Sequence, residues 1–207
     1  MSHTVAELNK IKRAPAVEGV LPLIHQRWSP RAFADRPVST PELVSVFEAA
    51  RWAPSSGNGQ PWRFLVGQLG DSTHSKILSA LVDFNKSWAA KAPVLILGTA
   101  LSINPKNRTP NAYALFDLGA ATFSLALQAE HMGLTAHQMA GFDHQAARKS
   151  LAIPEDYALG SVMALGYQGD PSALANEELK KREMAPRERK PLSEIVFASW
   201  DTPAVFA

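Results

Sequence analysis

Patterns typical of helices alternate along this chain with short apolar runs typical of buried strands, and this alternation restricts the possible folds more than any other feature. Ser39 and Glu42 have the spacing of a capping box, so a helix is expected to begin there and to end before Pro54. Strands are expected at residues 64–66, 93–97, 134–139 and 161–165, with further helices at 20–27, 71–81, 111–132 and from 143. This order predicts an α+β fold, in which helices pack on a small mixed sheet.

The longest helical pattern, from Asn111 to Met132, carries small or apolar residues on both of its sides. Such a pattern suits a central helix that is covered all round, and Gly133 would end it as a C-cap. The positions expected to point mostly inward are Tyr113, Phe116, Ala120, Phe123, Leu127 and Ala129.

The length of 207 residues fits a single domain, 1–207, with a core of ordinary size. Within it we take residues 1–19 as an N-terminal extension and residues 170–207 as a C-terminal arm, whose charged part is expected to lie along a surface. No apolar run approaches the ~20 residues of a transmembrane helix, and charged residues interrupt the first thirty, where a secretory signal needs an apolar core. A cytoplasmic protein with no membrane partner is therefore expected.

Net charge and cysteine content narrow the possible functions. A net charge of +2 gives little overall attraction to nucleic acid, so no nucleic-acid partner is expected. The chain has no cysteine, which excludes disulfides, thiolate metal sites and cysteine nucleophiles, so any redox chemistry must come from a bound cofactor. Rossmann, Walker and hydrolase-elbow sequences do not occur, and the six scattered histidines predict no metal site.

A compact group of cationic and hydroxyl side chains lies at the end of the helix expected at residues 20–27. Its residues are Arg27, Trp28, Ser29, Pro30 and Arg31. A guanidinium can pair with two phosphate oxygens at once, so this run is a candidate anion receptor. Taken alone, it is equally well explained by two solvated arginines at a helix end.

A polar turn with two glycines lies about 25 residues further on and leads into an apolar run. Its residues are Pro54, Ser55, Ser56, Gly57, Asn58, Gly59, Gln60, Pro61 and Trp62. Glycines in such a turn allow close approach of the backbone to a ligand. The alternative is an ordinary polar turn before a core tryptophan.

Together the two segments resemble the signature of the FMN-dependent nitroreductase family. The resemblance implies an α+β homodimer with FMN bound at each of two interface sites. It implies that Arg27 and Ser29, with Trp28 between them, bind the FMN phosphate. Arg31 would reach the pyrimidine edge of the flavin ring, where a cation stabilises the reduced anion. The residues that would cover the flavin from the opposite subunit are Pro54, Ser55, Ser56, Asn58 and Gln60.

Three further segments match the family in order along the chain. Asn85 occupies a place where the family often has an asparagine beside the flavin ring, although a helix cap is the alternative. Ala140 and Gly141 begin a turn in which a backbone N–H would face the hydride-accepting nitrogen of the flavin. Arg187 and Arg189 would complete the phosphate site, the alternative being a solvated charged run.

The resemblance implies a ping-pong reaction, in which NADH or NADPH delivers hydride to FMN and a nitroaromatic, quinone or similar oxidant then takes the electrons. No catalytic side chain is expected, since protons can come from water. Residues 102–111 would form a substrate lid, where Lys106 and Arg108 suggest an anionic substrate or the dinucleotide phosphate. Two other functions stay open: an FMN store or redox sensor without turnover, and a basic interaction module formed by residues 180–190.

Overall fold

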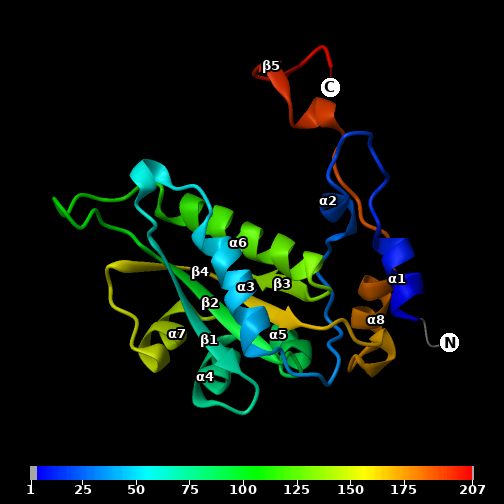
Figure 1. Ribbon diagram of the computed structural model, residues 1–207, viewed down its shortest axis with the longest axis horizontal. Coiled ribbons are helices and arrows are strands. Elements are labelled where there is room, and N and C mark those ends of the chain that lie inside the picture. Colours follow the sequence, from blue (N-terminus) through cyan, green and yellow to red (C-terminus); the bar gives the residue numbers. More distant parts are fainter. Residues whose placement is uncertain (1–3, 207) are drawn as a thin grey trace.

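The computed structural model describes residues 4–206, and at its centre is a four-stranded sheet with helices packed around it (Figure 1). The strands are β1 (Trp62–Gln68), β2 (Val94–Leu101), β3 (Thr135–Met139) and β4 (Tyr157–Gly166), in the order β1-β2-β4-β3. Each pair of neighbours in this sheet is antiparallel. The α+β class is therefore confirmed, whereas the sheet expected to be mixed is antiparallel in this chain.

The connection between β1 and β2 illustrates why the pairing is antiparallel. The N–H of Leu69, just after β1, donates to the carbonyl of Pro93, just before β2, so the chain re-enters the sheet where it left it. A parallel pair instead needs a crossover that carries the chain back to the start of the previous strand. Here the chain forms two short helices, α4 (Ser72–Ala80) and α5 (Asp83–Ala89), and returns to the same end of the sheet.

Each face of the sheet has its own apolar core. Two helices, α3 (Thr40–Arg51) and α6 (Ala114–His131), cover one face, while α4, α5 and α7 (His144–Leu151) cover the other. In β2, Val94 and Ile96 belong to the first core, and Leu95 and Leu97 to the second. A strand that is apolar on both faces is what a sheet between two helical layers requires.

The expected helix starts are confirmed by their caps. Ser39 and Glu42 form a reciprocal capping box at α3, and Asp71 accepts a hydrogen bond of 2.7 Å from the N–H of His74 at α4. Asp143 caps α7 in the same way. The helix expected at 20–27 is the shorter α2 (Pro22–Gln26). None of the helices between residues 4 and 206 is long and apolar enough to cross a bilayer.

The expected inward face of α6 is wrong. Of the six positions named for it, only Ala129 is buried, and Tyr113, Phe116 and Phe123 are 57%, 75% and 45% exposed. The face that packs on the sheet is built mainly from smaller side chains: Ala114, Asp117, Leu118, Ala121, Thr122, Leu125, Ala126 and Ala129. Small residues let the helix approach the strands closely, so the large aromatic rings are left on the outer face.

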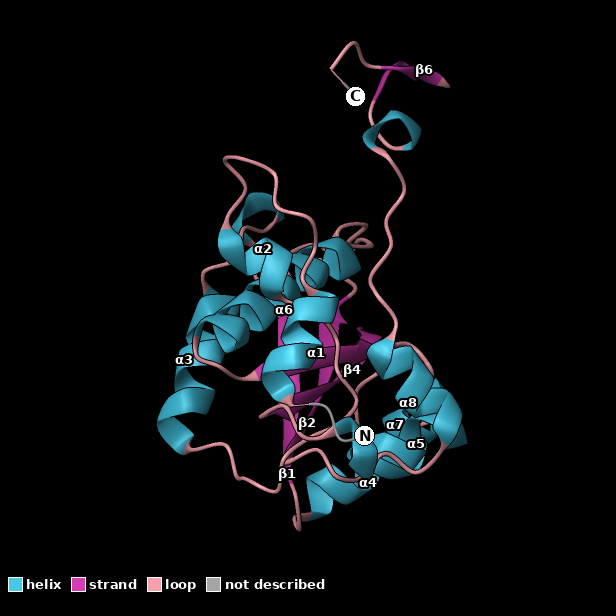
Figure 2. Ribbon diagram, turned by 90° about the vertical axis from the view of Figure 1, so that its right-hand side faces the viewer, coloured by secondary structure: helices cyan, strands magenta, loops and turns pink. Residues whose placement is uncertain are grey.

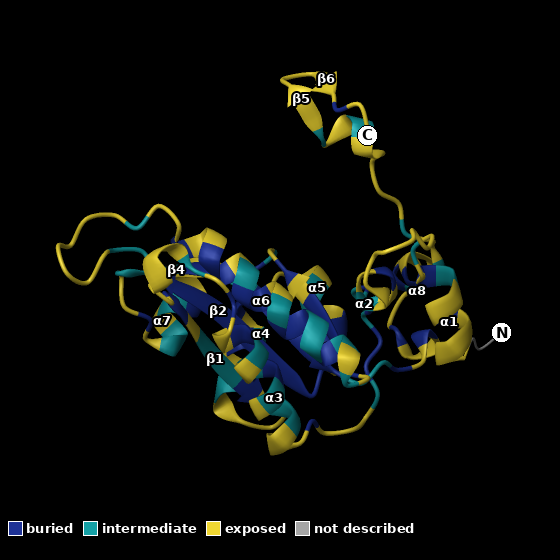
Figure 3. Cartoon of the chain, turned by 45° about the horizontal axis from the view of Figure 1, so that its top comes forward, coloured by how far each residue is buried: buried dark blue, intermediate teal, exposed yellow. Residues whose placement is uncertain are grey.

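The first and last α-helices of residues 4–206 lie side by side. Helix α1 (Val5–Lys12) packs on α8 (Glu177–Met184), which follows the one-turn helix η2 (Pro171–Ala173). Beyond α8 the arm leaves the body and ends in η3 (Leu192–Glu194) and a hairpin of β5 (Phe197–Ser199) and β6 (Thr202–Pro203) (Figure 2). Strands β5 and β6 are exposed (Figure 3). The charged tail was expected to lie along a surface, but Leu179 and Glu183 of α8 are fully buried.

Candidate functional site

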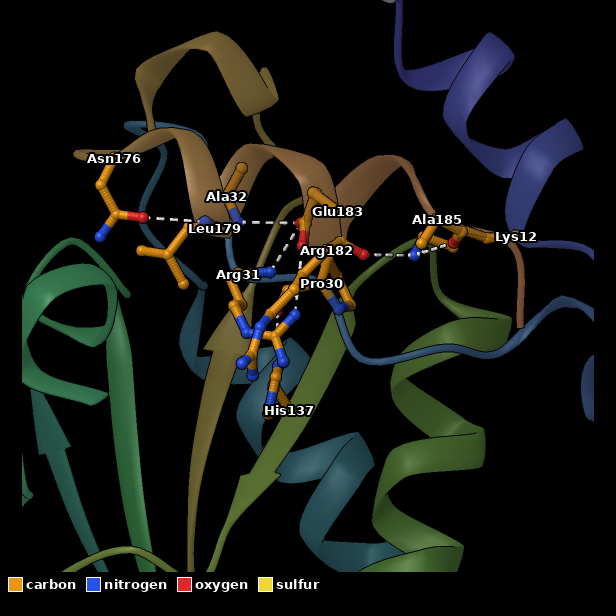
Figure 4. Close-up of polar contacts among 10 residues, drawn as sticks. All are labelled: Lys12, Pro30, Arg31, Ala32, His137, Asn176, Leu179, Arg182, Glu183 and Ala185. Atoms are coloured by element: carbon orange, nitrogen blue, oxygen red, sulfur yellow. Dashed lines mark hydrogen bonds and ion pairs between the residues drawn. The ribbon is translucent and has the colours of Figure 1, made fainter. Parts of the chain in front are cut away.

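The backbone of the arginine-rich segment is held by side chains from distant parts of the chain (Figure 4). Glu183 of α8 accepts hydrogen bonds from the N–H groups of Arg31 at 2.7 Å and Ala32 at 3.2 Å. His137 of β3 lies 3.0 Å, through Nδ1, from the carbonyl oxygen of Pro30. Because a carbonyl can only accept, Nδ1 carries the proton. The segment is therefore a fixed part of the fold, and not a mobile helix end.

The C-terminal arm supplies a second contact to this segment. The guanidinium of Arg187 donates to the carbonyl oxygen of Arg27 at 2.5 Å and also to that of His25. Arg27 in turn lies 3.4 Å, through Nη1, from the hydroxyl of Ser29. The structure thus brings together residues that are 160 positions apart in the sequence. The side chain of Trp28 points elsewhere, since it is buried and donates to Asn9 at 3.2 Å.

An open cavity of about 990 Å³ lies beside these arginines. Its polar and charged lining comes from His25, Arg27, Arg187, Glu188, Arg189 and Lys190. Burial lowers the pKa of Arg27, which the nearby Glu130 raises and Arg189 lowers. Burial also lowers the pKa of Arg187, and the charges of Arg27 and Arg189 lower it further. Cations that oppose one another in this way favour an anionic ligand between them.

The side chain of Arg31 is engaged with a carboxylate. Its Nη1 lies 3.6 Å from Oε2 of Glu183, and its Nε is buried without a hydrogen-bond partner. Burial lowers the pKa of Arg31, while Glu183 raises it. Arg31, the cation expected at the flavin ring, therefore has part of its charge offset by Glu183 of the same chain.

The polar turn at residues 54–60 is exposed and preformed. It contains the one-turn helix η1 (Ser56–Asn58), and Gly57, Asn58 and Gln60 have φ values of 55°, 53° and 44°. The hydroxyl of Ser55 accepts from the N–H of Gln60 at 3.1 Å. The amide of Gln60 donates to the carbonyl and to the side chain of Asn58 at 3.2 and 3.1 Å. Two adjacent residues held in the left-handed region are what a site for close ligand contact requires.

This turn and the arginine segment do not meet within one chain. The N–H of Ser56 donates to Asp117, in the first turn of α6, at 3.1 Å. The charge of Arg27 acts instead on Glu130, near the last turn of α6. Asp117 and Glu130 are separated by about 20 Å along the helix axis, at 1.5 Å per residue. One ligand can use both segments only if the turn is supplied by a second copy of the chain.

Asn85 and Gly141, by contrast, are brought into contact. The side-chain amide of Asn85 donates to the carbonyl of Gly141 at 3.0 Å, and the N–H of Val82 donates to the same oxygen at 3.1 Å. Asn85 lies inside α5, so it is not a helix cap. An added Cβ at residue 141 would lie 2.8 Å from Nδ2 of Asn85, which explains the glycine. Ala140, just before it, is exposed.

Strand β3 connects the two parts of the site. It is an edge strand, so one row of its backbone groups has no partner strand. His137 contacts the arginine segment, and Gly141, four residues on, contacts Asn85. At about 3.3 Å per residue of extended chain, residues 137 and 141 are about 13 Å apart.

Two residues that organise this site, His137 and Glu183, were not predicted. His137 packs on Trp88 with ring centroids 4.6 Å apart, and burial together with Arg31 and Arg27 lowers its pKa to about 4. It is therefore neutral near pH 7. Glu183 stands in a charged run that resembles a solvated surface. The one available signal was its spacing of four from Leu179, which places both on one face of a helix.

The polar atoms left without partners fit a bound anion and ring at this place. Within residues 4–206, the buried side-chain nitrogens without a hydrogen bond are those of His25, Arg31, Trp88, Arg187 and Gln168, and the first four belong to the elements just described. Buried donors are rarely left unpaired, so their concentration here indicates a missing partner. Phosphate oxygens and the carbonyl edge of a flavin are acceptors, which is what FMN would bring.

The role of residues 102–111 as a substrate lid stays a prediction. Residues 102–111 form a loop held by a bridge between Ile103 and Pro110. Arg108 pairs with Asp156 at 3.0 Å, so its charge is already partnered, whereas Lys106 is exposed. Within residues 4–206 there is no group of three or more His, Asp or Glu side chains that could hold a metal ion.

Comparison with known proteins matches residues 24–167 to the nitroreductase family. The uncharacterized 15.4 kDa protein in the ask 5′ region of Mycolicibacterium smegmatis is 36% identical over 149 residues, 68% of this chain and 99% of that protein. An Archaeoglobus fulgidus protein, named as a candidate NADH dehydrogenase/NAD(P)H nitroreductase, is 30% identical over 74% of this chain and 88% of its own length. A crystal structure described as an oxidoreductase containing FMN shares 35% identity and a TM-score of 0.85, covering 92% of this chain and 96% of that one.

Proposed function

This chain belongs to the nitroreductase family, and from that premise we propose that it is an FMN-dependent NAD(P)H oxidoreductase. When bound, FMN would supply the redox chemistry, a ping-pong transfer of hydride from NADH or NADPH to a nitroaromatic, a quinone or a similar small oxidant. A relative named for NAD(P)H and a similar structure described as containing FMN support this proposal.

The chain's own residues bind and orient the cofactor. Arg27 and Ser29, with Arg187 and Arg189 from the C-terminal arm, hold the phosphate, and the fixed cations cost no rearrangement when the anion binds. Arg31 lies at the pyrimidine edge of the ring. The main-chain turn at Ala140 and Gly141, supported by Asn85, would place a backbone N–H against the hydride-accepting nitrogen of the ring. No side chain is required as a general acid.

A second copy of the chain completes each site. The ~20 Å that separates the arginine segment from the turn at 54–60 along α6 is the observation that supports this arrangement. The exposed aromatic rings of Tyr113, Phe116 and Phe123 on α6 supply an apolar surface of the kind that subunits bury. In a homodimer of this kind, the turn at 54–60 of one subunit covers the flavin held by the other and excludes water from it.

The observation that carries the proposal is the gathering of Arg27, Arg187 and Arg189 around one cavity, which Phe123 of α6 also lines. The first experiment is the visible absorption spectrum of the purified protein, with the released chromophore identified by mass. We expect FMN at about one per chain, or its uptake when added, followed by oxidation of NADPH with a quinone. A protein that refuses added FMN contradicts the proposal. A protein that binds FMN but does not turn over is a store or a sensor.

A further inference from the structure

A fully buried carboxylate lies directly beside the cation assigned to the flavin ring. Glu183 is 0% exposed and stands on α8, more than 150 residues from the segment it contacts. Two cationic side chains act on it, Arg31 at 3.6 Å and Lys12 of α1. Lys12 donates to the last carbonyls of α8, those of Arg182 at 2.8 Å and Ala185 at 2.5 Å.

The two oxygens of Glu183 have different partners. Oε1 accepts both backbone hydrogen bonds, from Arg31 and Ala32. Oε2 makes no hydrogen bond and faces the guanidinium of Arg31. A buried carboxylate is costly unless it is paired, so this geometry ties the direction of the Arg31 side chain to the carboxylate.

We propose that Glu183 is a positioning residue for the flavin: Oε1 fixes the backbone of Arg31, and Oε2 orients its guanidinium and offsets its charge. The proposal rests on the proposed function, because it takes Arg31 as a contact of the flavin ring. Reduction places negative charge at that edge of the ring, and a partly offset cation stabilises this charge less than a free one. Glu183 therefore keeps the reduction potential of the bound flavin low, which favours transfer of electrons onward to the oxidant.

Two substitutions separate the oxygen contacts from the charge. Glu183→Gln keeps an oxygen for the two backbone N–H groups and removes the charge, whereas Glu183→Ala removes both. Glu178→Gln is the matched control, since Glu178 lies on the same helix, is exposed and pairs with Arg182 at 2.6 Å. Thermal unfolding of each variant shows whether it is folded before FMN is added.

The midpoint potential and the dissociation constant of oxidised FMN are then measured. A unit charge at about 10 Å in a medium of effective dielectric constant ~20 changes an affinity by roughly tenfold. We therefore expect Glu183→Gln to raise the preference for reduced over oxidised FMN by roughly tenfold, a potential shift of about +30 mV. Glu183→Ala should also weaken the binding of oxidised FMN about tenfold, since the backbone of Arg31 loses its acceptor. Glu178→Gln should leave both quantities unchanged.

A double-mutant cycle ties the effect to Arg31. In the background of Arg31→Met, Glu183→Gln should shift the potential clearly less, because only the direct effect of the Glu183 charge on the ring remains. If Glu183→Gln behaves like Glu178→Gln in a parent that binds FMN, or if its shift is as large without Arg31 as with it, the proposal is overturned while the proposed function stands. A parent that takes up no FMN overturns both.

Discussion

The affinity of single arginines at this site for an anion depends on their burial as well as on their charge. Arg27 is half-buried with its guanidinium close to two others, and burial lowers its pKa. A buried cation is poorly solvated, so a bound phosphate gains more from it than from a surface lysine. The same burial makes these cations energetically unfavourable when no anion is bound. Ligand binding is therefore expected to stabilise the arginine-rich segment.

We expect Arg27→Ala to weaken FMN binding by roughly 1.5–3 kcal/mol, the scale of a hydrogen bond to a charged group. This corresponds to about a 10- to 150-fold rise in the dissociation constant. Quenching of flavin fluorescence during titration with protein measures it. Lys76→Ala removes one exposed positive charge from α4 and serves as the control for net charge. An Arg27→Ala variant that retains FMN as firmly as the control rules out the assigned phosphate contact.

His137 predicts how stability depends on pH. Its pKa is lowered to about 4 in the folded chain, by burial and by Arg31 and Arg27, from an ordinary value near 6.5. Between these two values the unfolded chain binds more protons than the folded one, so stability falls as the pH falls from 6.5 to 4. At about 1.4 kcal/mol per pKa unit, the loss reaches about 3 kcal/mol.

The measurement is urea unfolding of FMN-free protein at pH 7 and pH 4.5, since bound ligand would add its own linkage. His137→Gln cannot titrate, so we expect it to lose about 2–3 kcal/mol less than the parent over this interval. The exposed His144→Gln should follow the parent. Parallel curves for all three proteins would mean that the titration of His137 does not account for the loss of stability.

At the scale of elements, local signals fixed where helices begin and which runs become strands. Ser39, Asp71 and Asp143 were recognisable as caps because capping depends on residues within one turn. The inward face of α6 was misjudged because both of its faces are apolar, and only the packing partner decides between them. Helix α8 and its buried Glu183 were missed because a charged run becomes buried only through contacts made far away in the sequence.

The turn between β3 and α7 predicts the effect of a single added methyl group. In Gly141→Ala the new Cβ would lie 2.8 Å from Nδ2 of Asn85 and 3.0 Å from Cγ2 of Val82, so one or both must shift. Overpacking of this kind costs about 1–3 kcal/mol of stability. Because the shift moves Asn85 away from the carbonyl it contacts, we also expect weaker FMN binding.

Chemical unfolding and FMN titration of Gly141→Ala test this expectation. The control is the same substitution in the background of Asn85→Ala, where the closest contact is absent. There the added cost to stability should be smaller, since only Val82 still has to move. Equal costs in the two backgrounds would show that Asn85 and Gly141 do not constrain each other.

At the scale of the whole molecule, the two segments proposed to form the site lie near opposite ends of α6. The arginine segment and the turn at 54–60 act on opposite ends of the helix, Glu130 and Asp117. The outer face of α6 carries exposed aromatic rings, and the C-terminal arm extends away from the body (Figure 2). Each of these features is explained if two copies of the chain pack against each other and each completes the site of its partner.

Complementation between two defective chains tests this division. Arg27→Ala damages the phosphate contact, and Asn58→Ala damages the turn proposed to cover the flavin of the other subunit. If each site combines both segments from different subunits, a mixed dimer of these variants contains one intact site and one doubly damaged site. If each site uses one chain, every site in the mixed dimer carries a single lesion.

We therefore expect a co-expressed mixture, isolated through two different affinity tags, to bind FMN tightly at about one site per dimer, although neither variant alone does so. Flavin content per tagged dimer and the dissociation constant of that site are the measurements. A sedimentation run confirms that the isolated species holds two chains. Because the recovered site consists of unmodified residues, its affinity should equal that of the parent protein. If a verified mixed dimer recovers no tight site, the two segments do not combine across subunits. The interpretation of the ~20 Å separation along α6 is then wrong.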